Sequence, residues 1–262
     1  NNFINTELEF NYNGLWVGDI YNVLVNKYYY QAKKIKWESG IAYSNLNTTS
    51  YSILKTDYAS ALKKGKTTLN QFQKLNDNKG IALTHLRIGK AQMLQGSYPN
   101  ALSSCFEALS IFEKLNDQKG IAETYSTIAR IYSYQGDHDE AIDFAFKSLK
   151  INQNIGYLSE KAMSLNTIGN CYYNKKEYSK SLEYWKQSLA LNQELGNKHK
   201  SDVEIDNIGW SYYKLSNFPL ALKYLHESLI LKLKTSTTNL KETRNWFCNY
   251  ITNKRYHRNP RQ

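Results

Sequence analysis

The chain has 262 residues, of which 41% are hydrophobic and 22% charged, a balance that excludes an intrinsically disordered protein. The formal net charge is +11, but much of the excess lies after position 240, which indicates a basic tail rather than a nucleic-acid-binding stripe. No run of about 18 apolar residues occurs, which excludes an ordinary membrane span, and no signal peptide is visible at the start.

The N-terminal part, residues 1–39, is predicted to cap a larger array. Residues 1–19 are rich in Asn and contain Gly14 and Gly18, so we expect mostly irregular structure as far as Asp19. From Ile20 to Ile35 the apolar residues follow helical spacing and predict one helix. This helix would be the remnant of a degenerate first repeat, because terminal repeats are often atypical.

A constant 40-residue period governs the next 200 residues. The string Gly-Ile-Ala opens at Gly40, Gly80 and Gly120, and degraded copies follow at Glu160 and Lys200 without insertion or deletion. Such a period indicates stacked copies of one supersecondary unit. The predicted units are 40–79, 80–119, 120–159, 160–199 and 200–239.

Each unit is predicted to form two helices. The first carries small and apolar residues at helical spacing and ends near a residue such as Gly96 or Gly136, which can adopt the left-handed backbone that closes a helix. The joints before the following units contain Asp77 and Asp117, which we expect to cap the next first helix. Residues 240–262 are predicted to form a short capping helix and a basic tail.

The repeat carries a family resemblance. Its residues in the fourth unit are Leu165, Ile168, Gly169, Tyr172, Ser181 and Trp185. Their spacing resembles the tetratricopeptide signature W-x2-L-G-x2-Y followed by A-x3-F, although the period is 40 residues instead of the usual 34 or so. The resemblance implies an all-α fold, a right-handed superhelix of antiparallel helix pairs. It also implies that the first helices line the concave face.

No catalytic constellation is apparent. The five histidines are scattered, the three cysteines lack metal-ligand spacing, and the glycines punctuate the repeats instead of forming a phosphate-binding loop. We therefore expect a binding protein that is not an enzyme and needs no metal or cofactor.

The candidate peptide-binding residues are the variable positions of the first helices, because positions on a concave face can diverge without disturbing the packing. Lys90 and Arg130 are suited to a carboxylate, and the amides of Asn166 and Asn170 to a peptide main chain. The other candidates are Leu86, Met93, Tyr173, Trp210 and Tyr213. We expect Lys90→Glu with Arg130→Glu to abolish binding and to leave the melting behaviour nearly unchanged.

The expected partner is a protein or peptide, acidic or bound by its C-terminus, and not nucleic acid. Long-period arrays of this kind resemble the sensory arrays of bacterial signalling proteins, which favours a sensory or scaffolding module. A cytosolic peptide-pheromone-type receptor that regulates transcription or a phosphatase stays open, as does a regulatory segment cut from a kinase or cyclase. We expect a cytoplasmic location, with a periplasmic sensory domain as the alternative. The sequence leaves the oligomeric state and any missing effector domain undetermined.

Overall fold

The computed structural model describes residues 14–235, and all the regular structure in this range is helical. A lone helix α1 (Gly14–Lys34) is followed by five helix pairs. The first helices are α2 (Glu38–Leu54), α4 (Asn78–Leu94), α6 (Gln118–Gln135), α8 (Leu158–Asn174) and α10 (Lys198–Lys214). The second helices are α3 (Tyr58–Lys74), α5 (Tyr98–Lys114), α7 (His138–Ile155), α9 (Tyr178–Glu194) and α11 (Phe218–Thr235). The predicted all-α array is confirmed, whereas the predicted capping helix and basic tail lie outside the described residues.

The N-terminal helix is longer than predicted. Because α1 begins at Gly14, the expectation of irregular structure as far as Asp19 is wrong for residues 14–19. A glycine inside a helix costs only about 1 kcal/mol relative to alanine. Each residue added to an existing helix gains a backbone hydrogen bond, so a long helix can continue through two glycines.

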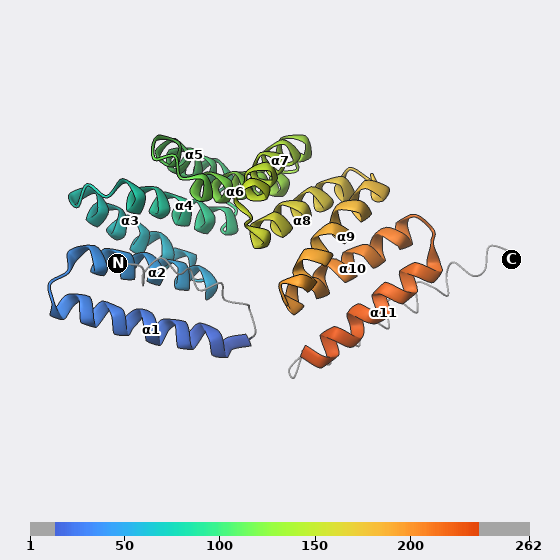
Figure 1. Cartoon of the computed structure of the whole chain (residues 1–262), viewed down its shortest axis with the longest axis horizontal. Helices are drawn as coiled ribbons and strands as arrows, with labels where there is room; N and C mark the ends of the chain where they lie inside the picture. Colours follow the sequence, from blue (N-terminus) through green and yellow to red (C-terminus); the bar gives the residue numbers. More distant parts are fainter. Residues whose placement is uncertain (1–13, 236–262) are drawn as a thin grey trace, which may run out of the picture.

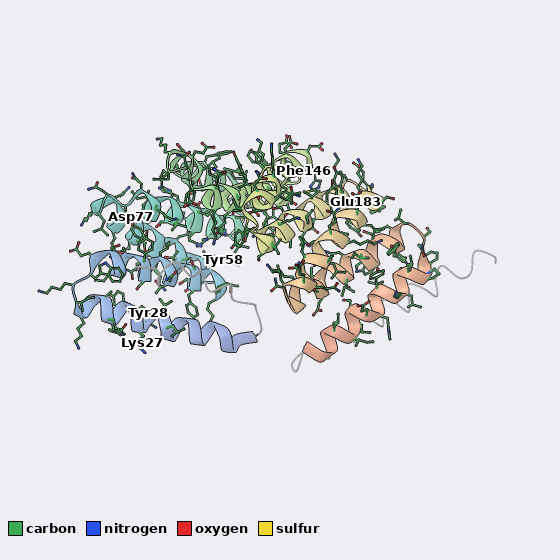
Figure 2. The ribbon with its side chains drawn as sticks, viewed as in Figure 1. Lys27, Tyr28, Tyr58, Asp77, Phe146 and Glu183 are labelled. Atoms are coloured by element: carbon green, nitrogen blue, oxygen red, sulfur yellow. The ribbon has the colours of Figure 1, made fainter. Side chains whose placement is uncertain are left out.

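The helix pairs stack into an arch, with α1 and α11 at its two ends and α5, α6 and α7 at its crest (Figure 1). Successive first helices, α2 with α4, α4 with α6 and α6 with α8, contact one another. No contact of similar extent joins successive second helices among the described residues. In a curved stack the inner elements approach most closely, so the first helices form the inner side. Figure 2 shows Phe146 of α7 and Glu183 of α9, both on second helices, along the outer side.

The joints between units use the predicted caps. The carboxylates of Asp77 and Asp117 accept hydrogen bonds from the backbone N–H groups of Gly80 (2.8 Å) and Gly120 (3.0 Å). Each carboxylate therefore satisfies one of the orphan donors of a helix start. The turn after each first helix contains one residue in the expected left-handed backbone conformation. This holds even in the fourth unit, where Lys176 replaces the glycine and has φ of 63°.

Close approach within a unit depends on small residues. A Cβ atom added to Gly169 would lie 2.6 Å from Cδ1 of Trp185, which is closer than van der Waals contact allows. The third unit places Ala129 and Ala145 at the same two positions, and both are fully buried. A large residue on one helix therefore requires glycine on the other, whereas two alanines share the same space.

The loss of Gly-Ile-Ala in later units has a packing reason. A Cβ on Gly80 would lie 2.3 Å from Cδ1 of Phe72, and Gly120 meets Phe112 at the same distance. The unit ahead of Glu160 carries Asn152 where the earlier units carry phenylalanine. A side chain is tolerated at position 160 because no aromatic ring stands against it.

Candidate functional site

The candidate site is the inner face of the array, by which we mean the half-buried side chains of the first helices. Seven of the nine predicted residues lie there, on α4, α6, α8 and α10: Lys90, Arg130, Asn166, Asn170, Tyr173, Trp210 and Tyr213. Because four consecutive units contribute, any ligand that touched all of them would have to be extended along the array.

Two predicted residues do not belong to this face. Leu86 is 0% exposed and Met93 is 2% exposed, and both pack in the core cluster formed by α4, α5 and α6. The prediction that they contact a peptide is therefore wrong. Their positions in α4 point into the contact between helices, where apolar side chains are kept from water.

A second correction concerns Lys90. Its Nζ donates a hydrogen bond to Oε1 of Glu123 at 2.6 Å, and Nη1 of Arg87 reaches the same oxygen at 2.7 Å. These side chains bridge α4 to α6, so Lys90 holds two units together. Lys90→Glu would set two carboxylates against each other. The structure therefore changes one expectation: the Lys90→Glu, Arg130→Glu variant should melt below the wild type, because it breaks the contact between α4 and α6.

Glu123 is strongly held as an anion. Burial opposes its ionisation, but Lys90 and Arg87 outweigh that cost and hold the pKa of Glu123 well below its usual range. The sequence reasoning missed Glu123 and Arg87. A signal was present, since Glu123 is a charge in a column that is otherwise uncharged: Tyr43, Leu83, Met163 and Val203.

Arg130 is a cation of the inner face that has no partner among the residues the structure describes. It occupies the position of Lys90 one unit later, but the residue one unit after Glu123 is Met163. The side chain is half-buried, and no ion pair or hydrogen bond joins it to another residue between 14 and 235. A partly desolvated guanidinium without a partner favours binding of an external carboxylate, which can accept two parallel hydrogen bonds.

The next unit presents an amide pair. Nδ2 of Asn170 donates a hydrogen bond to Oδ1 of Asn166 at 3.0 Å along α8. This bond leaves the carbonyl oxygen and a second N–H of Asn170 for other partners. Such groups match the alternating donors and acceptors of an extended peptide main chain.

Aromatic rings of α8 and α10 also lie on the inner face. Trp210 and Tyr213 of α10 meet edge to face with ring centroids 5.8 Å apart. Tyr173 of α8 packs against Trp185 at 5.5 Å, and burial raises the pKa of the Tyr173 hydroxyl. The rings are partly exposed and partly fixed by neighbours, so they offer apolar contact area at low cost in side-chain entropy.

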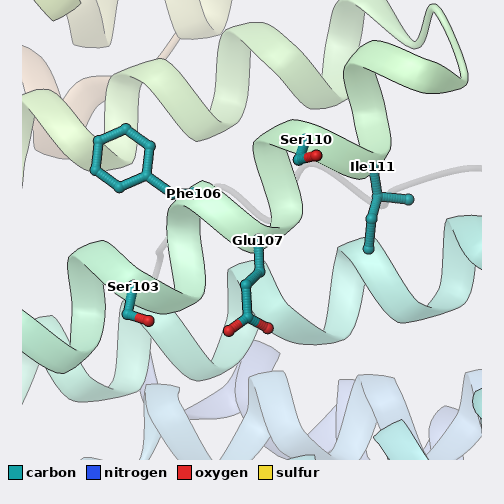
Figure 3. Close-up of a pocket in the computed structure, with 5 residues that line it drawn as sticks. All are labelled: Ser103, Phe106, Glu107, Ser110 and Ile111. Atoms are coloured by element: carbon teal, nitrogen blue, oxygen red, sulfur yellow. The ribbon is translucent and has the colours of Figure 1, made fainter.

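One surface hollow of the described residues lies elsewhere. It measures about 640 Å³ and is lined by Ser103, Phe106, Glu107, Ser110 and Ile111, all on the second helix α5 (Figure 3). Glu107 faces Nδ1 of His85 at 3.1 Å. No predicted site residue lines this hollow, which is a wide, open surface of one helix. In the same described range, no helix is both long and apolar enough to cross a bilayer.

Comparison with known families agrees with this geometry. Residues 80–154 and residues 162–195 each match the description "tetratricopeptide repeat". The chain carries tetratricopeptide repeats. The repeats of this family are protein-binding modules, and the matched residues include Lys90, Arg130, Asn166 and Asn170. No curated protein matches the chain by sequence alone.

Solved structures share the fold at low sequence identity. BtubC from P. vanneervenii has a TM-score of 0.70 and 14% identity over 85% of this chain and 93% of that chain. A Rap protein complexed with competence and sporulation factor has a TM-score of 0.67 and 14% identity over 74% of this chain and 54% of that chain. A signal transduction ATPase from Pyrococcus horikoshii with a tetratricopeptide repeat sensor has a TM-score of 0.67 and 18% identity, covering 84% of this chain and 35% of that chain.

Proposed function

We propose that this tetratricopeptide array is a peptide-binding module whose inner face takes an extended peptide with a carboxylate at Arg130. The observation that carries the proposal is the difference between two cations at equivalent positions. Lys90 is neutralised by Glu123 of the next unit, whereas the residue equivalent to Glu123 one unit beyond Arg130 is the uncharged Met163, and no ion pair or hydrogen bond joins Arg130 to another described residue. The preferred anion is an acidic side chain or a C-terminal carboxylate.

The remaining contacts follow from the order of the units. The amides of Asn166 and Asn170, one unit beyond Arg130, would hold the peptide main chain. Trp210 and Tyr213, a further unit on, would contact apolar side chains. The central charge cluster is internally paired, so it contributes rigidity and leaves recognition of the anion to Arg130.

We propose binding without catalysis, in the cytoplasm, as the sensing or scaffolding part of a bacterial signalling protein. Two structural neighbours support this context. One is a signal transduction ATPase with a tetratricopeptide repeat sensor, and the other is a Rap protein complexed with competence and sporulation factor. The second neighbour favours a peptide-receptor role as the alternative within the same class. The full reading frame tests which of these roles applies. A kinase, cyclase or DNA-binding domain on either side of the array would distinguish the sensing or scaffolding module from the peptide receptor.

The binding proposal is tested with an array of random octapeptides printed once with free and once with amidated C-termini. Peptides that bind are then measured by fluorescence anisotropy against the wild type and Arg130→Gln. Loss of a charge-assisted hydrogen bond costs about 1.5–3 kcal/mol, so we expect the affinity to fall roughly tenfold to a hundredfold. The matched control is Lys150→Gln, which removes the same charge from an exposed position of the second helix α7.

Two outcomes would contradict the proposal. One is equal binding by Arg130→Gln and the wild type. The other is a set of bound peptides that contains neither acidic side chains nor a requirement for the free C-terminus.

A further inference from the structure

A second surface lies apart from the inner face, at the turn that joins α1 to α2. Five consecutive residues form it, and we call them the basic tip: Lys33, Lys34, Ile35, Lys36 and Trp37. All five are exposed, and Ile35 is 70% exposed. Helix α1 stands at one end of the arch (Figure 1), and none of the candidate peptide-binding residues belongs to this turn. The basic tip can therefore serve a partner of its own.

The charge of the basic tip is not a property of the repeat. At the three positions of its lysines, the later joints between units carry in turn one lysine, an opposite pair, no charge and one acid: Lys74, Glu113 with Lys114, none, and Glu194. No ion pair or hydrogen bond joins the three lysine side chains of the tip to another residue between 14 and 235. Glu38, the next residue along the chain, offsets only one of the three charges. The fold therefore leaves an excess of positive charge at this turn for an external anion.

One of these lysines is also unfavourable for local folding. Lys36 has a left-handed φ of 56°, and the equivalent residues of the later joints are of the types that tolerate this backbone: Asn76, Asn116, Gly156 and Gly196. For a lysine the same conformation brings the Cβ atom too close to the following carbonyl oxygen. The geometry of the turn therefore does not account for a lysine at position 36.

Two apolar side chains accompany the lysines. Ile35 is more exposed than the equivalent residues of the later joints, which are 41% or 42% exposed or half-buried: Leu115, Ile155, Leu75 and Leu195. Trp37 is 43% exposed, but its ring is held against the start of α2, because a Cβ atom on Gly40 would lie 2.2 Å from Cε3 of Trp37. The basic tip thus presents an aliphatic side chain that the fold hardly covers, beside an indole that is fixed on one side.

We propose that the basic tip docks the array on a membrane surface that contains anionic phospholipids. Lysines near such a surface are attracted by the lipid phosphates. Tryptophan favours the headgroup region, and an aliphatic side chain such as Ile35 gains free energy on leaving water for the acyl chains. Single-stranded nucleic acid would use the lysines and the indole, but it offers no apolar phase to Ile35. Docking through one end of the arch leaves the inner face accessible to a peptide.

The test is flotation of the full chain with phosphatidylcholine vesicles that either contain or lack phosphatidylglycerol. We expect the wild type to bind only the anionic vesicles. The charge variant is Lys33→Gln with Lys34→Asn and Lys36→Asn, which installs residue types that later joints carry at these positions. Each lysine near an anionic surface contributes about fivefold in affinity, so this variant should bind about a hundredfold more weakly. Ile35→Ser removes the aliphatic contact and should weaken binding about tenfold.

Two controls separate the basic tip from charge and apolar surface in general. The first is Lys63→Gln with Lys66→Gln and Lys150→Gln, which removes the same charge from exposed positions of α3 and α7. The second is Leu115→Ser, which makes the equivalent of the Ile35 change at the joint before α6. Both controls should bind anionic vesicles nearly as well as the wild type does.

The proposal is overturned if the wild type does not bind anionic vesicles, or if the control that lacks three lysines loses as much affinity as the charge variant. It is also overturned if Ile35→Ser binds like the wild type. Binding of a single-stranded oligonucleotide that depends on the three lysines would then assign the basic tip to nucleic acid. Circular dichroism shows whether each variant is folded. If the charge variant does not fold, the comparison of Ile35→Ser with Leu115→Ser decides alone.

Discussion

The charge cluster between α4 and α6 makes a quantitative prediction. Glu123→Gln keeps the shape of the side chain but removes the anion that lies 2.6 Å from Nζ of Lys90 and 2.7 Å from Nη1 of Arg87. The side chains of Glu123, Arg87 and Lys90 are 12%, 18% and 25% exposed, so two cations would be left partly desolvated without their counter-charge.

The expected cost follows from the burial. Breaking a fully buried ion pair by removing one partner costs about 3–5 kcal/mol. Because water reaches part of this cluster, we expect about 2–3 kcal/mol at pH 7. For a folded region of this size, 1 kcal/mol shifts the melting temperature by about 2–4 °C, so Glu123→Gln should melt roughly 4–12 °C below the wild type.

The pH dependence has a defined sign. The folded-state pKa of Glu123 is depressed, so its stabilising contribution is complete above the unfolded-state value of about 4.5 and is lost as the pH falls towards the folded value. The gap between the wild type and Glu123→Gln should be constant from about pH 6 to pH 8 and should narrow steadily below about pH 4. Calorimetry or circular dichroism melts across this range measure it.

The matched control is Glu177→Gln. Glu177 pairs with Lys180 at 2.7 Å, but the two side chains are 35% and 57% exposed, and such surface pairs contribute little. This variant should melt with the wild type. Equal melting of Glu123→Gln and the wild type at pH 7, or an undiminished gap at pH 3, would refute the reasoning.

Two further predictions concern the backbone of the repeat. Lys176→Gly should raise the free energy of unfolding by about 1 kcal/mol, because Lys176 has a left-handed φ of 63° that glycine adopts without strain. Gly136→Ala should lower the free energy of unfolding by a similar amount, because Gly136 has φ of 93°. Urea melts measure both changes. Gly169→Ala should lower the free energy of unfolding by about 1–3 kcal/mol, because the new Cβ would lie 2.6 Å from Trp185. Trp185→Ala should remove this clash, so Gly169→Ala should cost less in a protein that already carries Trp185→Ala.

Much of the architecture follows from local patterns alone. The 40-residue period, the capping carboxylates of Asp77 and Asp117, and the small residue at Gly169 each depend on neighbours at fixed spacing, and the structure has all of them. The candidate site was only partly predictable. The repeat alone predicts that Arg130 and Asn170 lie on first helices, because side chains at equivalent positions of each unit point in the same direction.

Pairings between units required the tertiary structure. Whether Lys90 is free or neutralised depends on Glu123, which lies in the next unit and in a different column. Burial of Leu86 and the reach of Glu204 to Asn192 likewise depend on how closely one helix pair stacks on the next. A period in the sequence specifies which residues share a position in the unit. The distance between two different positions in adjacent units is decided only when the units pack.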